Sequence, residues 1–251
     1  MNQIRREKIR KYIQEKGAVS IKELTELFPD VSVMTIHRDL AKLEEEKLII
    51  RTRGGAMALN YHGVTEGKLE TRMQRNVVEK RDIAHKALGL IYTDSTVFFD
   101  AGTSCMALAQ VLPDIELNIF TTAPNIAVQL SHLVNPTIHM CGGTLNRANQ
   151  AVSGASTLAM LEHINIATAF IGVSGYTQDG GFTCGKEDEM QVKRLIMKKA
   201  ARKVILMDSS KCGKIFPYMF GKMEDVDYII SDGNLPEEFL KLAEEANVTV
   251  L

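Results

Sequence analysis

Residues 31–40 read VSVMTIHRDL, and this stretch decides the fold of the first sixty residues. Ser32 is a favoured N-cap residue, and the apolar residues after it recur at helical spacing, which predicts a helix with one buried face. The apolar positions of that helix are Val33, Ile36, Leu40 and Leu43. Its other face begins with four residues that we expect to be exposed: Met34, Thr35, His37 and Arg38.

Two more helices are predicted before this one. Apolar residues at helical spacing indicate a helix over residues 3–16, with Gly17 as its C-terminal stop. Ser20 and Glu23 have the spacing of a capping box, in which each side chain bonds the other's backbone amide. The helix that they open, residues 21–28, is short because Pro29 and Asp30 end it.

A small hairpin is predicted after the third helix. Residues 48–50, Leu-Ile-Ile, favour a strand, and the glycine pair 54–55 favours a hairpin turn. Three helices and a hairpin predict a winged helix-turn-helix, whose third helix enters the major groove of DNA. We expect Arg51 and Arg53 on the wing to contact phosphate or to reach toward the minor groove. The alternative is a three-helix protein-binding module with a solvated polar face.

These residues resemble the DNA-binding region of DeoR-type bacterial transcription regulators. The resemblance rests on residues 31–40 and on Arg51-Thr-Arg-Gly-Gly-Ala56, and it covers most of residues 1–58. The family more often has two consecutive arginines where this chain has His37 and Arg38. A neutral imidazole donates one hydrogen bond and lacks the guanidinium fork that pairs with guanine, so the base preference at His37 is expected to differ. The DNA-binding residues predicted in this way are Ser32, Met34, Thr35, His37, Arg38, Arg51 and Arg53.

Charge and composition limit the remaining possibilities. The 251 residues carry a net charge of −1, but residues 1–60 hold 12 basic and 9 acidic side chains, so the basic excess lies at the N-terminal end. A hydrophobic content of 45% is that of a globular protein rather than a disordered or collagen-like chain. The sequence has no long apolar run, begins with charged residues, and spaces its four cysteines far apart. We therefore expect a cytoplasmic protein without membrane contact, disulfides or a zinc site.

The rest of the chain predicts a second, larger domain. We expect a linker and a long connecting helix (residues 69–91) within 59–95, between a DNA-binding domain at 1–58 and an α/β domain at 96–251. In the latter, apolar runs alternate with helical stretches, which favours a mainly parallel sheet. The predicted strands are 97–99, 118–121, 137–140, 168–171, 204–207, 228–230 and 248–250. The predicted helices are 104–112, 124–133, 155–163, 187–200 and 236–246.

Polar residues follow five of these strands. Ligands of parallel sheets bind beyond the carboxyl ends of the strands, where helix N-termini offer free amides. The residues in question are Asp100, Gly102, Thr103 and Ser104, then Thr121 and Thr122, Gly142 and Gly143, Gly172, and Asp208 and Lys211. Carboxylates suit sugar hydroxyls, and a lysine with amides suits a phosphate. These residues therefore predict a site for a small phosphorylated polyol at the carboxyl-end edge of the sheet.

The same loops also resemble the effector domain of DeoR-type regulators, so the resemblance covers nearly the whole chain. It implies an α/β sensor fold like that of ribose-5-phosphate isomerase and the coenzyme A transferases. It also implies a phosphorylated sugar or related metabolite as effector, and repression of sugar-catabolic genes that the effector relieves. The implied effector residues are those of the five loops together with Glu187.

Other functions are compatible with parts of the sequence. A sugar-phosphate isomerase or deaminase could use Asp100, Glu187, Asp208 and Lys211 as acid, base and phosphate clamp, and an RNA or protein adaptor would not bind duplex DNA. No residue pattern predicts a cofactor or a metal. We expect an operator of two half-sites, hence a homodimer or homotetramer. The basic run Lys193-Arg194 to Lys198-Lys199 is expected on the solvated face of its helix.

Overall fold

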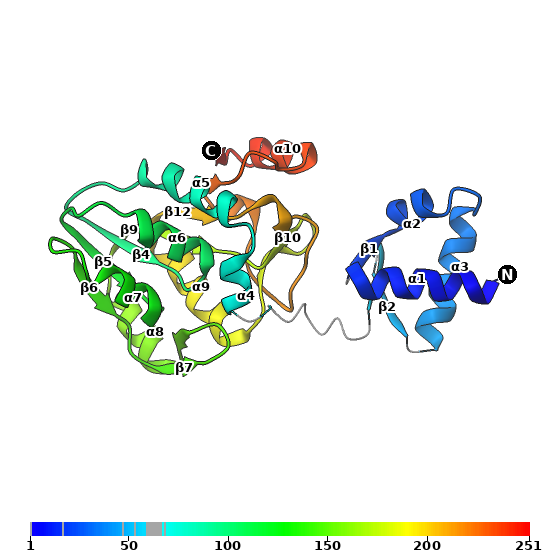
Figure 1. Cartoon of the computed structure of the whole chain (residues 1–251), viewed down its shortest axis with the longest axis horizontal. Coiled ribbons are helices and arrows are strands. Elements are labelled where there is room, and N and C mark those ends of the chain that lie inside the picture. The colour runs from blue at the N-terminus through cyan, green and yellow to red at the C-terminus, as the bar shows by residue number, and fades with distance from the viewer. Residues whose placement is uncertain (1, 17, 47, 53, 59–66, 68) are drawn as a thin grey trace. The chain divides into compact units, whose positions relative to one another are not determined.

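The computed structural model describes residues 2–16, 18–46, 48–52, 54–58, 67 and 69–251. The chain forms two compact units, Met1–Thr65 and Glu66–Leu251, which Figure 1 shows as ribbons. Three positions with sequence-based expectations, Gly17, Arg53 and the linker at 59–66, lie outside the described residues. Among the described helices, none is long and apolar enough to cross a membrane.

The first unit is the predicted winged helix-turn-helix. Its helices are α1 (Asn2–Lys16), α2 (Ile21–Leu27) and α3 (Val33–Glu45), and its strands are β1 (Ala18–Ser20), β2 (Ile49–Thr52) and β3 (Gly55–Ala58). The strands form an antiparallel sheet in the order β1-β3-β2, so β1, which the sequence did not reveal, completes the wing.

Local signals explain where these helices begin. The Ser20 hydroxyl accepts from the Glu23 amide at 3.1 Å and the Glu23 carboxylate accepts from the Ser20 amide at 2.8 Å, which confirms the capping box. Ile36, Leu40 and Leu43 are buried as predicted. Val33 is not: it is 46% exposed, because the first turn of α3 extends past the three-helix core.

The second unit is built on a seven-stranded sheet whose neighbouring strands are all parallel. The order is β15-β14-β12-β9-β4-β5-β6. The strands are β4 (Ser95–Phe99), β5 (Leu117–Thr121), β6 (Thr137–Met140), β9 (Ile166–Gly172), β12 (Ala200–Leu206), β14 (Tyr228–Ile230) and β15 (Thr249–Val250). All seven predicted strands are thereby confirmed.

Helices cover both faces of this sheet (Figure 1). They are α5 (Val77–Leu88), α6 (Thr103–Val111), α7 (Pro124–Leu130), α8 (Ala155–Glu162), α9 (Glu187–Lys199) and α10 (Glu237–Glu245). Successive residues of a strand point to opposite faces. Accordingly Phe99 packs in one core with α5, α6 and α7, whereas Phe98 packs in the other with α8, α9 and α10.

Several short strands were not predicted. A second antiparallel sheet consists of β10 (Gly175–Thr177), β11 (Gly181–Cys184) and β13 (Tyr218–Gly221), in the order β10-β11-β13. A hairpin consists of β7 (Thr144–Asn146) and β8 (Ala151–Ser153). Both lie in loops that follow strands of the main sheet, and therefore near the edge where ligands of parallel sheets bind.

The prediction of one connecting helix over residues 69–91 is wrong. The structure has two helices, α4 (Leu69–Gln74) and α5, and they are separated at Asn76, whose φ is 49° and ψ 45°. Both helices belong to the compact unit Glu66–Leu251, and α5 packs on α6. Met73 and Val77, which we expected on one apolar stripe, are 40% and 55% exposed because the break ends that stripe.

Candidate DNA interface and effector site

The start of α3 presents the predicted base-reading residues to solvent. Ser32 caps the helix and accepts from the Thr35 amide, and its hydroxyl also lies 2.9 Å from that of Thr35. Met34 is 63% exposed and Arg38 is exposed, whereas Thr35 and His37 are half-buried. These side chains therefore occupy the first two turns of one helix, the part that enters a major groove in helix-turn-helix proteins.

A buried ion pair orients this helix. The Arg5 guanidinium donates from Nε to the Asp39 carboxylate at 2.6 Å, and Asp39 is 6% exposed. This hydrogen bond to Asp39 raises the pKa of Arg5. The pair ties α1 to the middle of α3, where Asp39 is buried while its neighbour Arg38 is exposed.

The wing is anchored to the same helix. The Arg51 amide donates to the Glu44 carboxylate at 2.9 Å, and the Arg51 guanidinium lies 3.9 Å from the other Glu44 oxygen. Arg51 is exposed, so contact with a DNA phosphate would only require it to exchange a solvated carboxylate for that phosphate.

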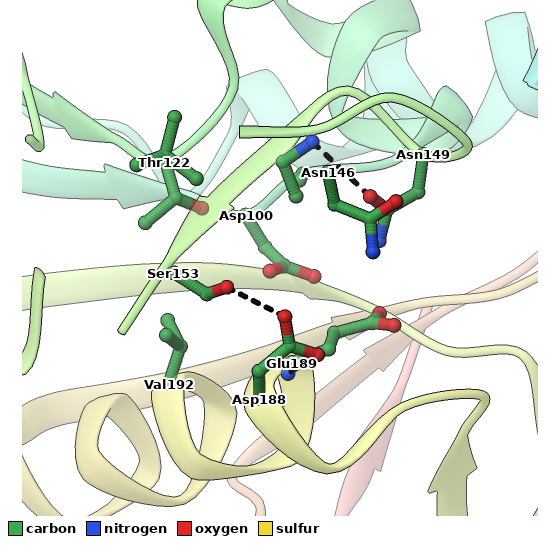
Figure 2. A pocket seen from close by; sticks show the side chains of 11 residues that line it. Asp100, Thr122, Asn146, Asn149, Ser153, Asp188, Glu189 and Val192 are labelled. Atoms are coloured by element: carbon green, nitrogen blue, oxygen red, sulfur yellow. Dashed lines mark hydrogen bonds between the residues drawn. The ribbon is translucent and has the colours of Figure 1, made fainter. Parts of the chain in front are cut away.

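In the second unit, a small pocket lies at the carboxyl ends of the strands, and most of the side chains that line it are polar (Figure 2). Two of the predicted effector residues, Asp100 after β4 and Thr122 after β5, line it. The other polar residues that line it are Asn146, Asn149, Ser153, Asp188 and Glu189. The unpredicted β7–β8 hairpin and the first turn of α9 thus supply most of its polar wall.

Lys193 contradicts the expectation of a solvated basic face on α9. It is 2% exposed, and its ammonium contacts the Asp100 carboxylate, Glu189 at 3.3 Å and the Gly172 carbonyl at 2.8 Å. Gly172 also donates its amide to Asp100 at 3.0 Å. Desolvation lowers the pKa of Lys193, but the two carboxylates outweigh it, so the net pKa is raised and the side chain is a buried cation.

The hairpin and α9 are joined across the pocket. The Ser153 hydroxyl donates to Asp188 at 2.6 Å, a contact drawn in Figure 2. Asn149 accepts from the Ala151 amide at 3.2 Å, which holds the hairpin turn. Glu187, the predicted acidic residue of this helix, is exposed and does not line the pocket; its neighbours Asp188 and Glu189 do.

The glycines and threonines of the other loops shape the backbone around the pocket. The Thr157 hydroxyl donates to the Gly142 carbonyl at 2.6 Å, and a Cβ on Gly143 would lie 2.3 Å from that hydroxyl, so only glycine fits. The Thr121 hydroxyl accepts from the Ala123 amide at 3.1 Å. Gly102 precedes α6, with Thr103 half-buried and Ser104 buried in its first turn.

A second group of predicted residues lies at the end of β12. Asp208 is 1% exposed, and its Oδ1 accepts from the Ser210 amide at 3.1 Å and from the Asn76 side chain at 2.8 Å. Among the described residues, its Oδ2 meets no hydrogen-bond partner. Lys211 follows in the 3₁₀ turn η1 (Ser209–Lys211) and is half-buried.

Cations from other segments gather around this group. Desolvation and then repulsion by Lys211 lower the pKa of Lys80 on α5, and the same two causes lower that of Lys214. Arg75 is a further cation close to Lys214. Sequence reasoning missed Lys80, Lys193 and Asn76, because each lies inside a helical pattern where a polar residue usually faces solvent.

A winged helix-turn-helix with an outward polar helix, joined to a parallel α/β unit with a polar pocket, defines a DNA-binding regulator with a sensor domain. Residues 5–61 match the model of the DeoR-like helix-turn-helix domain, and residues 75–233 match that of the DeoR C terminal sensor domain. The chain belongs to the DeoR family of transcriptional regulators.

Relatives in other organisms are similar to this chain along nearly its whole length. The chain is 32% identical to the HTH-type transcriptional regulator GlpR of Haloferax volcanii, over 98% of this chain and 96% of that protein. It is 30% identical to the transcriptional repressor GlcR of Bacillus subtilis, over 96% and 92%. It is also 30% identical to the L-fucose operon activator of Haemophilus influenzae, over 98% and 99%.

Solved structures give distant likenesses only. Ribose 5-phosphate isomerase A of Methanocaldococcus jannaschii matches with a TM-score of 0.39 and 13% identity, covering 53% of each chain. The eIF2B delta structure from Chaetomium thermophilum matches with a TM-score of 0.47 and 12% identity, over 63% of this chain and 57% of that one.

Proposed function

We propose that this regulator binds a double-stranded operator through α3 and the wing, represses carbohydrate-catabolic genes, and releases DNA when a phosphorylated sugar binds its sensor domain. The relative named L-fucose operon activator supports the class of target gene, and the relative named transcriptional repressor GlcR supports repression as the direction of control. We further propose that the protein acts in the cytoplasm, as a homodimer or homotetramer, because one helix-turn-helix covers a single half-site.

The DNA half of the proposal rests on the exposed residues of α3 and β2. Arg38 supplies a charged donor to a base edge, and Met34, Thr35 and His37 lie beside it on α3. Ser32 and Arg51 are placed to contact phosphates, and Arg53 remains a proposed wing contact. The Arg5–Asp39 pair supports this assignment because it holds α3 with these residues outward.

The observation that carries the effector half is the group around Asp208. Desolvation, and after it repulsion by Lys211, lowers the pKa values of Lys80 and Lys214, and a bound phosphate would oppose both effects. The unpartnered Asp208 oxygen beside them accepts a hydrogen bond from a hydroxyl of the same ligand. A phosphate with an adjacent hydroxyl fits both requirements.

The rest of the sugar extends toward the pocket at Asp100. β12 and β4 are separated only by β9, so their ends lie about 10 Å apart at the usual strand spacing. Asp100, Asp188 and Thr122 then face the hydroxyls, while Gly102, Thr103 and Ser104 contribute free amides at the start of α6. Thr121, Gly142, Gly143 and Gly172 shape the loops, and Glu187 remains a proposed contact at the rim.

Mobility shifts test the proposal. The full chain is titrated onto the DNA upstream of its own gene, and a panel of five- and six-carbon sugar monophosphates is added, with the unphosphorylated sugars as controls. We expect specific binding that Arg38→Ala weakens severely and that one phosphorylated sugar reverses. Binding unaffected by Arg38→Ala would contradict the placement of α3, and failure of every phosphorylated sugar to release DNA would contradict the effector class.

A further inference from the structure

The break between α4 and α5 is held by a side chain that reaches the effector group. Asn76 has a left-handed backbone, with φ 49° and ψ 45°, which asparagine tolerates better than most residues. Its side-chain amide donates to Asp208 Oδ1 at 2.8 Å and to the Ser210 hydroxyl at 3.1 Å. The turn that interrupts the helix is therefore fastened to the loop after β12.

A second tie holds the end of α4. The Lys80 ammonium, on the first turns of α5, donates to the Arg72 carbonyl at 2.6 Å and also to the Arg75 carbonyl. These are carbonyls at the C-terminal end of α4, where a helix leaves them without intrahelical partners. Lys80 is 6% exposed, and Lys211 repels it. The Lys80 ammonium thus binds the end of α4 and also lies next to the cations proposed to hold a phosphate.

These two ties hold the helix that directly follows the linker from the DNA-binding unit. Residues 59–68 join β3 of the DNA-binding unit to α4, so α4 is the first helix of the second unit that the chain enters. Both ties involve groups that the proposed ligand would contact. Lys80 binds the end of α4 and would contact the phosphate, and Asp208 accepts from Asn76 and would also accept from the ligand hydroxyl. A ligand bound at Lys80 and at Asp208 Oδ2 would therefore weaken the hydrogen bonds that hold α4.

We propose that Asn76 is a positioning residue that couples effector binding to α4; the inference rests on the proposed function. Without effector, Asn76 and Lys80 hold α4 against the sensor unit. A phosphate at Lys211 draws Lys80 away from the α4 carbonyls. The adjacent hydroxyl donates to Asp208 Oδ2, and because it takes up part of the carboxylate charge it weakens the hydrogen bond from Asn76 to Oδ1. An effector shifts the equilibrium only by such differential contacts.

Hydrogen exchange on the full chain tests this, with inorganic phosphate as the probe and chloride at equal ionic strength as the control. Asn76→Gly removes the amide and keeps the left-handed backbone at no steric cost. Asn247→Gly is the matched control, because Asn247 also has a positive φ of 59° and follows α10. We expect phosphate to accelerate exchange at residues 69–74 of the parent. Asn76→Gly should exchange there at least about fivefold faster without phosphate, because it loses both hydrogen bonds of the Asn76 side chain.

The outcomes separate this inference from the proposed function. Exchange in Asn76→Gly as slow as in the parent, or protection of residues 69–74 by phosphate, overturns the coupling. Release of operator by a sugar phosphate with no change at residues 69–74 also overturns it and leaves the proposed function intact. Faster exchange in Asn76→Gly, when no sugar phosphate releases operator, supports the hold on α4 and contradicts the effector class. Asn247→Gly should match the parent throughout.

Discussion

Lys193 is a buried cation between two carboxylates. It shows why contacts between individual buried charges could not be predicted from the sequence. Its partner Asp100 lies 93 positions away along the chain, and no spacing rule joins them. The flanking Arg194 and Lys198 are exposed, so the run looks uniformly solvated until the fold brings β4 and β9 beside α9. Ser32 and the Ser20–Glu23 cap, by contrast, are predictable because each acts on amides within three residues.

Replacing Lys193 with methionine should lower the free energy of unfolding by about 3–5 kcal/mol, because it leaves a buried carboxylate without its cation. Urea denaturation measures this, with Lys198→Met on the exposed face of α9 as the matched control. The raised pKa means that this stabilisation is fully present below the ordinary lysine pKa of 10.5 and is lost as pH rises through the folded value. A loss below about 1 kcal/mol would show that the pair is solvated.

His37 concerns specificity rather than stability. It lies on the second turn of α3, one residue before Arg38, at a position where the resemblance to DeoR-type regulators leads us to expect an arginine. His37→Arg should change the preferred base at one position per half-site by roughly 1–3 kcal/mol, since it adds a bidentate donor. Selection of binding sites from random DNA by both proteins measures the change, and identical selected motifs would place His37 against phosphate or solvent.

At the scale of elements, the seven parallel strands and most helices were predictable from runs of apolar residues and local stop signals. The short antiparallel strands were not, since β10, β11 and β13 are stabilised by one another and carry only three or four residues each. The break at Asn76 was missed for a similar reason: apolar residues continue on both sides of it, and the contact that stabilises it comes from Asp208.

The α4–α5 junction also makes a prediction about pH. Desolvation, followed by repulsion from Lys211 and Arg72, lowers the pKa of Lys80, while Asp208 and Glu79 partly oppose this. The unfolded chain therefore binds more protons than the folded one between the lowered pKa and 10.5, so stability rises with pH in that window. Denaturation of the parent and of Lys80→Met at successive pH values should show a steeper slope in the parent, and Lys214, whose pKa is also lowered, accounts for the slope that remains in the variant. Equal slopes in both proteins would assign the dependence to other groups.

At the scale of the whole molecule, we expect Lys211 to link effector binding to the release of DNA. Lys211→Ala removes a charge-assisted contact of about 1.5–3 kcal/mol, which is very roughly 10- to 150-fold in effector affinity. We expect normal operator binding and no release at effector concentrations that free the parent, as measured by mobility shift. Lys241→Ala, on exposed α10, is the control. Loss of operator binding in Lys211→Ala would instead make the residue structural.

The strand order of the large sheet has a consequence during synthesis. β4 pairs with β5, which follows it closely, and with β9, which begins at Ile166. At translation rates of about 5–20 residues per second, the ribosome delivers β9 several seconds after β4. Until then one backbone edge of an apolar strand is open to pairing with other nascent chains. We therefore expect the yield of folded regulator to respond to codon choice between residues 100 and 165 more than elsewhere in the gene.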